Sequence, residues 1–139
     1  MIVILDTSVI VSAFLSPSGP PAEIVHRWEL HEFDVAVSSA LISELESVLG
    51  YPRIARHLKW PEETISSFGR RYASAAILVE PRMRLEVIGE DPTDNRVLEC
   101  AIAGNAAYVV TGDKHILDIK EYQGIVMLSP AGFLAFLNS

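Results

Sequence analysis

Short apolar segments alternate with longer segments of helical periodicity along the whole chain. The apolar segments are short and rich in β-branched side chains, as is typical of buried strands; they are residues 2–5, 35–37, 77–79, 108–110 and 125–127. Helices are expected between and after them, over residues 7–15, 22–30, 40–49, 61–74, 91–105, 115–117 and 129–137. Strands that alternate with helices predict an α/β fold, here a three-layer α/β/α sandwich with a central parallel sheet of about five strands.

Polar residues and prolines indicate where several of these helices begin and end. Ser38 and Ser39 are expected to cap the helix from residue 40, because a serine side chain accepts a hydrogen bond from a free amide of the first turn. Asp91 is expected to cap a later helix, with Pro92 as its first residue. The run Gly50-Tyr51-Pro52 is expected to end the helix that precedes it.

The length and composition fit one domain over residues 1–139. With 139 residues, 50% of them hydrophobic and 21% charged, the chain can bury a core without disulfides. No apolar stretch approaches the ~18–20 residues that a membrane helix needs. The single cysteine, Cys100, cannot form an internal disulfide and is expected to be a buried structural side chain. These features predict a cytoplasmic protein.

Charge is distributed unevenly along the chain. The net charge of −7 argues against a general nucleic-acid binder, yet residues 51–84 carry seven basic side chains against three acidic ones. A basic middle between acidic ends could contact the phosphate backbone of RNA. The candidates for that contact are Arg53, Arg56, Lys59, Arg70, Arg71 and, further along, Lys114. A solvated helical face explains the same charges equally well, so the sequence leaves both interpretations open.

Two aspartates follow strands of the predicted sheet. Asp6 ends the first strand, and Asp113 lies just beyond the fourth, after Thr111 and Gly112. In an open parallel sheet, ligands bind beyond the carboxyl ends of the strands, at the point where the strand order reverses. If the fourth strand lies beside the first, Asp6 and Asp113 share one crevice. Each aspartate could instead cap the helix that follows it.

Two further acids lie on the apolar sides of predicted helices. Glu44 has apolar neighbours three positions before it and four after it, and in the middle of a helix it has nothing to cap. Glu46 points away from that side and is the expected solvent-exposed comparison. Asp94 shares its side of a helix with Val97 and Leu98, although it could instead complement the helix dipole.

A cluster of these four carboxylates would need positive charge between its members. Two like charges ~4 Å apart repel by ~1 kcal/mol in water and by ~4 kcal/mol at an effective dielectric constant of about 20. Oxygen ligands without a nearby His or Cys pattern favour Mg²⁺ or Mn²⁺ over zinc. Such an ion makes a water more acidic and stabilises charge on phosphate, so phosphodiester hydrolysis is the expected chemistry. Asn95 is a further candidate, as a hydrogen-bond partner for a water of that ion.

Motifs along essentially the whole chain resemble the PIN domain family in order and spacing. They are Leu5-Asp6-Thr7-Ser8, the mid-helix Glu44, Asp91-Pro92-Thr93-Asp94-Asn95 and Thr111-Gly112-Asp113-Lys114. The closing run Leu128-Ser129-Pro130-Ala131-Gly132-Phe133-Leu134 resembles the end of the VapC-like toxin subgroup. The resemblance implies an α/β/α nuclease that cuts single-stranded RNA with Mg²⁺ or Mn²⁺. It also implies a cognate antitoxin as partner and a homodimer.

The resemblance assigns roles to single positions. The functional positions of the family carry over to Asp6, Glu44, Asp94, Asp113 and Thr111. Thr7 is a second candidate for the small hydroxyl residue. The chain departs from the family at Ser8, where many relatives have Asn, and the contact that this amide would make is therefore in question. Gly132 replaces a residue that is commonly acidic, which affects the last helix rather than the site.

Two other functions fit the same residues less well. A HAD-like phosphatase or phosphotransferase would use Asp6 as a covalent nucleophile, but the run Asp6-Thr7-Ser8 lacks a second Asp two residues further on. A non-catalytic module that binds RNA or a partner protein would keep the acids for structure alone. Metal-dependent cleavage of RNA distinguishes the first interpretation from both alternatives.

Overall fold

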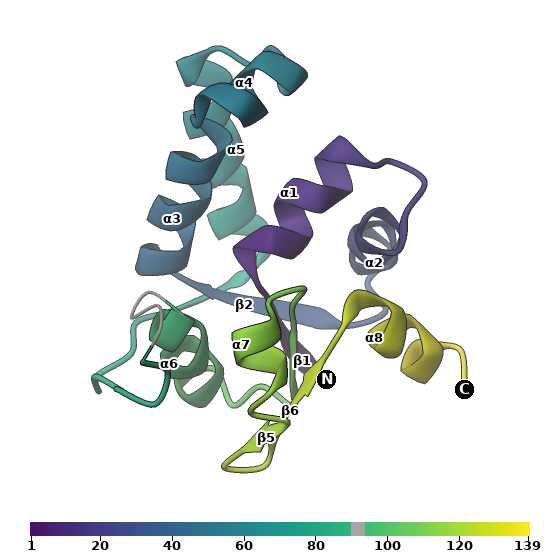
Figure 1. Cartoon of the computed structure of the whole chain (residues 1–139), viewed down its shortest axis with the longest axis vertical. Helices are drawn as coiled ribbons and strands as arrows, with labels where there is room; N and C mark the ends of the chain where they lie inside the picture. Colours follow the sequence, from purple (N-terminus) through teal and green to yellow (C-terminus); the bar gives the residue numbers. More distant parts are fainter. Residues whose placement is uncertain (90–93) are drawn as a thin grey trace.

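A six-stranded sheet with helices on both faces forms the protein (Figure 1). The structure, a computed structural model, describes residues 1–89 and 94–139. The strands are β1 (Ile2–Leu5), β2 (Asp34–Ser38), β3 (Ile77–Val79), β4 (Tyr108–Val110), β5 (Glu121–Tyr122) and β6 (Ile125–Leu128). They lie in the order β3-β2-β1-β4-β6-β5, and all except β5 are parallel to their neighbours. The predicted α/β fold with five parallel strands is confirmed.

The sixth strand, β5, is not predicted from the sequence, and it pairs antiparallel with β6 at the edge of the sheet. Its two residues are too few to show a periodic pattern. Gln123 and Gly124 connect β5 to β6 with φ angles of 50° and 84°, the left-handed conformation that a two-residue hairpin turn requires. This hairpin is therefore specified by its turn and by pairing with β6, not by apolar residues of its own.

Eight helices cover the sheet in the described ranges. They are α1 (Thr7–Leu15), α2 (Pro20–Glu29), α3 (Ser39–Leu49), α4 (Pro52–Leu58), α5 (Glu62–Ala75), α6 (Asn95–Ala103), α7 (Lys114–Leu117) and α8 (Pro130–Leu137). In Figure 1, α1, α3, α4 and α5 lie on one side of β2, and α6 lies on the other. None of the helices in the described ranges is long and apolar enough to cross a membrane.

Helix α4 is a correction to the sequence analysis, which uses Pro52 only to end α3. The structure places Pro52 in the first turn of α4 instead. A proline is well suited to that position, because its missing N–H would have no intrahelical acceptor there and its fixed φ is already helical. The short gap between the two helices, at Gly50 and Tyr51, brings the beginning of α4 close to the functional pocket described below.

The beginnings of α3 and α6 can be compared with their predicted caps. The Ser38 hydroxyl accepts a hydrogen bond from the Leu41 amide at 3.3 Å, so the predicted cap of α3 is confirmed. The predicted cap of α6, Asp91, and its predicted first residue, Pro92, lie outside the described residues. In the structure α6 begins at Asn95, and Asp94 is the residue that precedes it.

The strand order reverses at β1, which pairs with β2 on one side and with β4 on the other. The pairing continues one residue past β1, because the Asp6 amide donates to the Val110 carbonyl at 3.0 Å. The carboxyl ends of β1 and β4 therefore lie side by side, as the sequence analysis requires for a shared crevice. Helix α6 packs under these strands and approaches β2 closely at Gly104, where an added Cβ would lie 2.9 Å from the Cβ of Ala36.

Cys100 lies in this core, fully buried on α6. Burial raises the pKa of its thiol to about 12. A thiol that stays protonated at neutral pH is a poor nucleophile, so the structural role expected for Cys100 agrees with its surroundings.

Candidate active site

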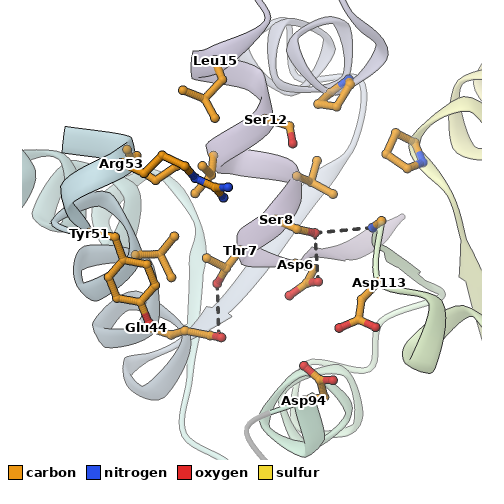
Figure 2. A pocket seen from close by; sticks show the side chains of 17 residues that line it. Asp6, Thr7, Ser8, Ser12, Leu15, Glu44, Tyr51, Arg53, Asp94 and Asp113 are labelled. Carbon is orange, nitrogen blue, oxygen red and sulfur yellow. Dashed lines mark hydrogen bonds between the residues drawn. The ribbon is translucent and has the colours of Figure 1, made fainter. Parts of the chain in front are cut away.

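A pocket of about 610 Å³ opens at the carboxyl edge of the sheet, where β1 and β4 meet. All four predicted carboxylates line it, and we call it the acidic pocket. Figure 2 shows Asp6 and Asp113 at the ends of the two strands, Asp94 facing them from the start of α6, and Glu44 reaching in from α3. The structure therefore brings together acids that lie far apart in the sequence.

Asp6 is the most enclosed of the four acids, at 6% exposed. Its Oδ2 atom accepts a hydrogen bond from the Thr111 hydroxyl at 2.7 Å and a second one from the Ser8 hydroxyl at 3.1 Å. Burial raises the pKa of the Asp6 carboxyl, these hydrogen bonds lower it in part, and the charge of Asp113 raises it further. The net shift is upward, so the pocket holds a carboxylate that is costly to ionise without a cation beside it. The side chain makes no capping hydrogen bond to α1.

Thr111 connects the ends of β1 and β4. Its side chain is fully buried, and its hydroxyl oxygen accepts a hydrogen bond from the Asp113 amide at 2.9 Å while its proton goes to Asp6. One hydroxyl thus fixes the Asp6 carboxylate and the backbone of Asp113 together. The hydroxyl role that the sequence analysis expects for Thr111 matches this geometry.

Asp113 combines the two roles that the sequence leaves open. Its Oδ1 atom accepts a hydrogen bond from the His115 amide at 2.8 Å, which caps the short helix α7. The same side chain is half-buried and lines the acidic pocket. Capping by one oxygen orients the carboxylate and leaves the other oxygen for a different partner.

Glu44 is held by Thr7, whose hydroxyl donates to Oε2 of Glu44 at 3.2 Å (Figure 2). Thr7 is 7% exposed and lies at the first position of α1, so this bond joins α1 to α3 beside the pocket. The expectation for Glu46 is wrong in one respect. It does point away from the acidic pocket, but it is half-buried, because α5 packs against α3 and brings Gly69 against the Glu46 side chain.

Asp94 and Asn95 are both buried, at 7% and 2% exposed, and have different surroundings. Asp94 lines the acidic pocket. The Asn95 side chain instead accepts from the Val87 and Ile88 amides at 2.9 Å each and donates to the Ile88 carbonyl at 2.9 Å. The suggestion that Asn95 contacts a water of the ion is therefore a poor fit, since its amide is used to anchor the segment before α6.

Ser8, which the sequence analysis gives as a departure from the family pattern, lines the acidic pocket. Its hydroxyl donates to Asp6 and accepts from the Gly112 amide at 3.4 Å. Like Thr111, it joins the end of β1 to the loop after β4. The serine at this position therefore orients Asp6 through its hydroxyl group.

A basic and an aromatic side chain line the pocket on the side of Glu44, away from Asp94 and Asp113 (Figure 2). Arg53 lines the acidic pocket, as does Tyr51, which is 55% exposed (Figure 2). The other predicted RNA contacts are exposed and lie outside the lining of this pocket; they are Arg56, Lys59, Arg70, Arg71 and Lys114. Tyr51 is missed from the sequence because the run around Pro52 resembles a helix end, and only the unpredicted helix α4 turns that run toward the site.

The donor set of the acidic pocket fits a hard divalent cation, because it consists of carboxylate oxygens. Within residues 1–89 and 94–139, however, no three Asp, Glu, His or Cys side chains are already close enough to hold a metal ion. The acids line one pocket without closing on one point. An ion in this pocket would therefore either draw these side chains closer together or be held by one or two of them, with water completing its coordination.

Comparison with protein families and with known sequences gives two matches. A model of the PIN domain family matches residues 2–115. The uncharacterized protein MJ1680 from Methanocaldococcus jannaschii is 24% identical over 119 residues, which are 86% of this chain and 75% of that protein. The family match includes the four carboxylates and Thr111 within its bounds.

The solved structures with a similar fold include the following three. PAE2754 from Pyrobaculum aerophilum gives a TM-score of 0.65 at 18% identity, over 98% of this chain and 88% of that one. VapBC2 from Rickettsia felis, bound to a DNA fragment from its promoter, gives a TM-score of 0.60 at 21% identity, over 93% of this chain and 98% of that one. VapBC-1 from nontypeable Haemophilus influenzae gives a TM-score of 0.60 at 14% identity, over 94% of this chain and 99% of that one. At these identities the likeness shows a common fold.

Proposed function

Because this chain belongs to the PIN domain family, a family of nucleases, we propose that it is an endoribonuclease that cuts single-stranded RNA with Mg²⁺ or Mn²⁺. The observation that carries the proposal is the acidic pocket, in which four carboxylates line one opening at the carboxyl edge of the sheet. The raised pKa of Asp6 supports it as well, since a buried carboxylate beside a second one is stabilised by a bound cation.

The chain's own residues have two tasks in this proposal. Asp6, Glu44, Asp94 and Asp113 would hold the ion. Thr111 and Ser8 orient Asp6 through their hydroxyl groups, and Thr7 orients Glu44. A bound divalent ion would supply a more acidic water and neutralise charge on the phosphate that is attacked.

The wall formed by Arg53 and Tyr51 fits a nucleotide of a single strand. Arg53 provides a guanidinium group for a backbone phosphate, and guanidinium groups bind phosphate through two parallel hydrogen bonds. The exposed ring of Tyr51 provides a surface on which a base can stack. A base is free to stack on protein only where it is not paired in a duplex, so this wall favours single-stranded RNA as the substrate.

The biological setting is proposed from the relatives. Two of the structurally similar proteins are solved as VapBC complexes. By analogy, this chain would be the toxin of a toxin–antitoxin pair, inhibited by a cognate antitoxin and acting as a homodimer in the cytoplasm.

The central test compares the wild type with two single substitutions that remove the same charge. Asp94→Asn changes an acid of the pocket, and Asp118→Asn changes an exposed acid at the end of α7, outside the pocket lining. Each protein is incubated with mixed-sequence single-stranded RNA and Mn²⁺, Mg²⁺ or EDTA. We expect cleavage by the wild type and by Asp118→Asn, no cleavage in EDTA, and a loss on the order of 100-fold or more for Asp94→Asn.

Other outcomes would assign a different function. Equal cleavage by all three proteins would indicate a contaminating nuclease or a misassigned acid. Absence of cleavage together with a melting temperature that does not respond to Mn²⁺ or Mg²⁺ would favour the non-catalytic alternative. A phosphoryl group trapped on Asp6 would favour the phosphatase alternative.

A further inference from the structure

A second pocket, of about 310 Å³, lies on the same edge of the sheet as the acidic pocket. It is lined by Ser38 and Ala40, by residues 80–84, and by Arg96 and Glu99 of α6. Ser38 ends β2, and residue 80 directly follows β3, so both contributions come from the carboxyl ends of parallel strands. Since three of its lining residues are arginines, we call it the arginine pocket.

The arginine pocket and the acidic pocket share two walls. On α3, Ala40 lines the arginine pocket and Glu44 lines the acidic pocket, and these residues are about one helical turn apart, a rise of about 6 Å. At the start of α6, Arg96 lines the arginine pocket and Asp94 lines the acidic pocket. An extended strand of RNA that left the acidic pocket between Glu44 of α3 and Asp94 would therefore come next to residues that line the arginine pocket.

Charge in the arginine pocket is opposite to that in the acidic pocket. Its acids already have partners: Glu99 is 4% exposed, lies 3.0 Å from the Arg96 guanidinium and accepts from the Leu85 amide at 2.8 Å. Glu80 accepts from the neutral Ser39 hydroxyl at 2.5 Å. Three arginines and two glutamates therefore give the lining a formal net charge of +1.

Two arginines of this pocket are accessible. The Arg84 side chain is 74% exposed and reaches Glu99 only at 3.8 Å, and Arg82 is exposed as well. Their guanidinium groups are therefore available to a ligand, whereas Arg96 is committed to Glu99. The segment that carries Arg82 and Arg84 runs from β3 toward α6 (Figure 1) and is anchored near its far end by Asn95.

We propose that Arg82 and Arg84 bind a backbone phosphate of the RNA strand, at a nucleotide adjacent to the one in the acidic pocket. The acidic pocket repels RNA until a cation is bound. Part of the binding free energy for the strand must therefore come from neighbouring positive charge. Guanidinium groups suit this role because they pair with phosphate in a fixed fork geometry. The choice of RNA rests on the proposed function, but binding can be measured without cleavage.

The test is a binding experiment with two charge-matched double variants. Arg82→Ala with Arg84→Ala removes the proposed phosphate-binding groups, and Arg70→Ala with Arg71→Ala removes two exposed charges on α5, outside both pockets. Arg96 is left intact, because its loss would leave the buried Glu99 without its nearest cation. Fluorescence anisotropy in Ca²⁺, a hard cation that can take the place of Mg²⁺ or Mn²⁺ in the acidic pocket, then gives the Kd of each protein for a single-stranded RNA dinucleotide and an octanucleotide, at several salt concentrations. Each RNA is checked for cleavage after the measurement.

We expect the removal of Arg82 and Arg84 to weaken the binding of the octanucleotide only. Their removal should weaken octanucleotide binding about tenfold and reduce the salt-dependence slope by about 0.7 for each phosphate that the variant no longer binds. Dinucleotide binding should stay the same, because a dinucleotide fills the acidic pocket alone. The Arg70/Arg71 variant should lose clearly less affinity for the octanucleotide.

Several results would overturn the proposal. They are an octanucleotide affinity that does not depend on Arg82 and Arg84, an equal loss in both double variants, or an equal loss for both RNA lengths. Binding of a glutamate octamer that depends on these arginines as strongly as RNA does would assign the pocket to an acidic protein segment instead. RNA binding of the expected kind by a protein that never cleaves would refute the nuclease and leave this inference standing.

Discussion

The side chains of Asp6 and Thr111 are joined by a 2.7 Å hydrogen bond although 105 positions separate them in the sequence. The bond crosses the point where the strand order reverses, between the ends of β1 and β4. It is buried on both sides, since neither side chain is more than 6% exposed. The same hydroxyl accepts from the Asp113 amide, so the geometry of two acids depends on one threonine.

Thr111→Val should therefore damage both stability and activity. Valine has the shape of threonine, but it removes the donor to Asp6 and the acceptor for the Asp113 amide, and leaving a buried polar group unpaired costs about 1–3 kcal/mol. We expect a loss of that size in urea unfolding, with a fall in kcat/KM for RNA. Thr111→Ser is the control, because it keeps the hydroxyl. A Thr111→Val protein as stable and active as the serine variant would contradict the bridging role.

Glu44 and Glu46 form a matched pair on α3, two positions apart and on different faces. Glu44→Gln removes one charge from the acidic pocket, and Glu46→Gln removes one from the contact between α3 and α5. Cleavage should fall on the order of 100-fold in Glu44→Gln, because the loss of one residue from a set that acts as a unit removes most of the activity of the whole set. It should stay within about twofold in Glu46→Gln. Similar losses in both variants would mean that Glu44 acts through helix packing and not through the site.

The five parallel strands and most helices are predictable because each has a local pattern. A strand such as β1 is a buried run of β-branched residues, and α3 carries both a serine cap and a period of 3.6 residues. The positions of the four acids follow from the same patterns, since strand ends and apolar helix faces are visible in the sequence. Their meeting in one pocket also required the adjacency of β1 and β4, which only the resemblance to a family and the topology rule suggested.

The features that the sequence analysis missed depend on contacts between distant segments. Strand β5 is defined by its partner β6, and the half-buried state of Glu46 depends on the approach of α5. Tyr51 reaches the pocket because α4 begins at Pro52, where the sequence indicates only the end of α3. In each case the residue's own neighbours in the sequence carry no signal for the partner that decides its environment.

Gly104 tests how closely α6 must pack on β2. An added Cβ would lie 2.9 Å from Ala36 Cβ and 3.3 Å from the Cys100 carbonyl oxygen, so Gly104→Ala should push the end of α6 away from the sheet. Overpacking of this kind costs about 1–3 kcal/mol, which urea unfolding can measure. Gly89→Ala is the control, because no described atom lies within 4 Å of a Cβ at that position. Equal stability of the two variants would show that α6 can shift freely.

The buried carboxyl of Asp6 makes stability depend on pH in a direction opposite to that of a salt-bridged aspartate. Its pKa is raised in the folded protein, mainly by burial, and an unfolded aspartate has a pKa of about 3.9. Between these two values the folded state binds more protons than the unfolded state, so stability falls as pH rises through that interval. Below it the carboxyl is protonated in both states and the cost disappears.

Asp6→Asn removes this cost, so without divalent metal the variant should melt at a higher temperature than the wild type at pH 7. The difference should shrink as pH is lowered toward about 3, below the pKa of about 3.9 of an unfolded aspartate, because the carboxyl is then mostly protonated in either state. Mg²⁺ or Mn²⁺ should reverse the order at pH 7, since a ligand at a hundredfold excess over Kd stabilises by about 2.7 kcal/mol and the variant lacks one of the proposed ligands. A wild type that stays less stable than Asp6→Asn at saturating metal would argue against Asp6 as part of a metal site.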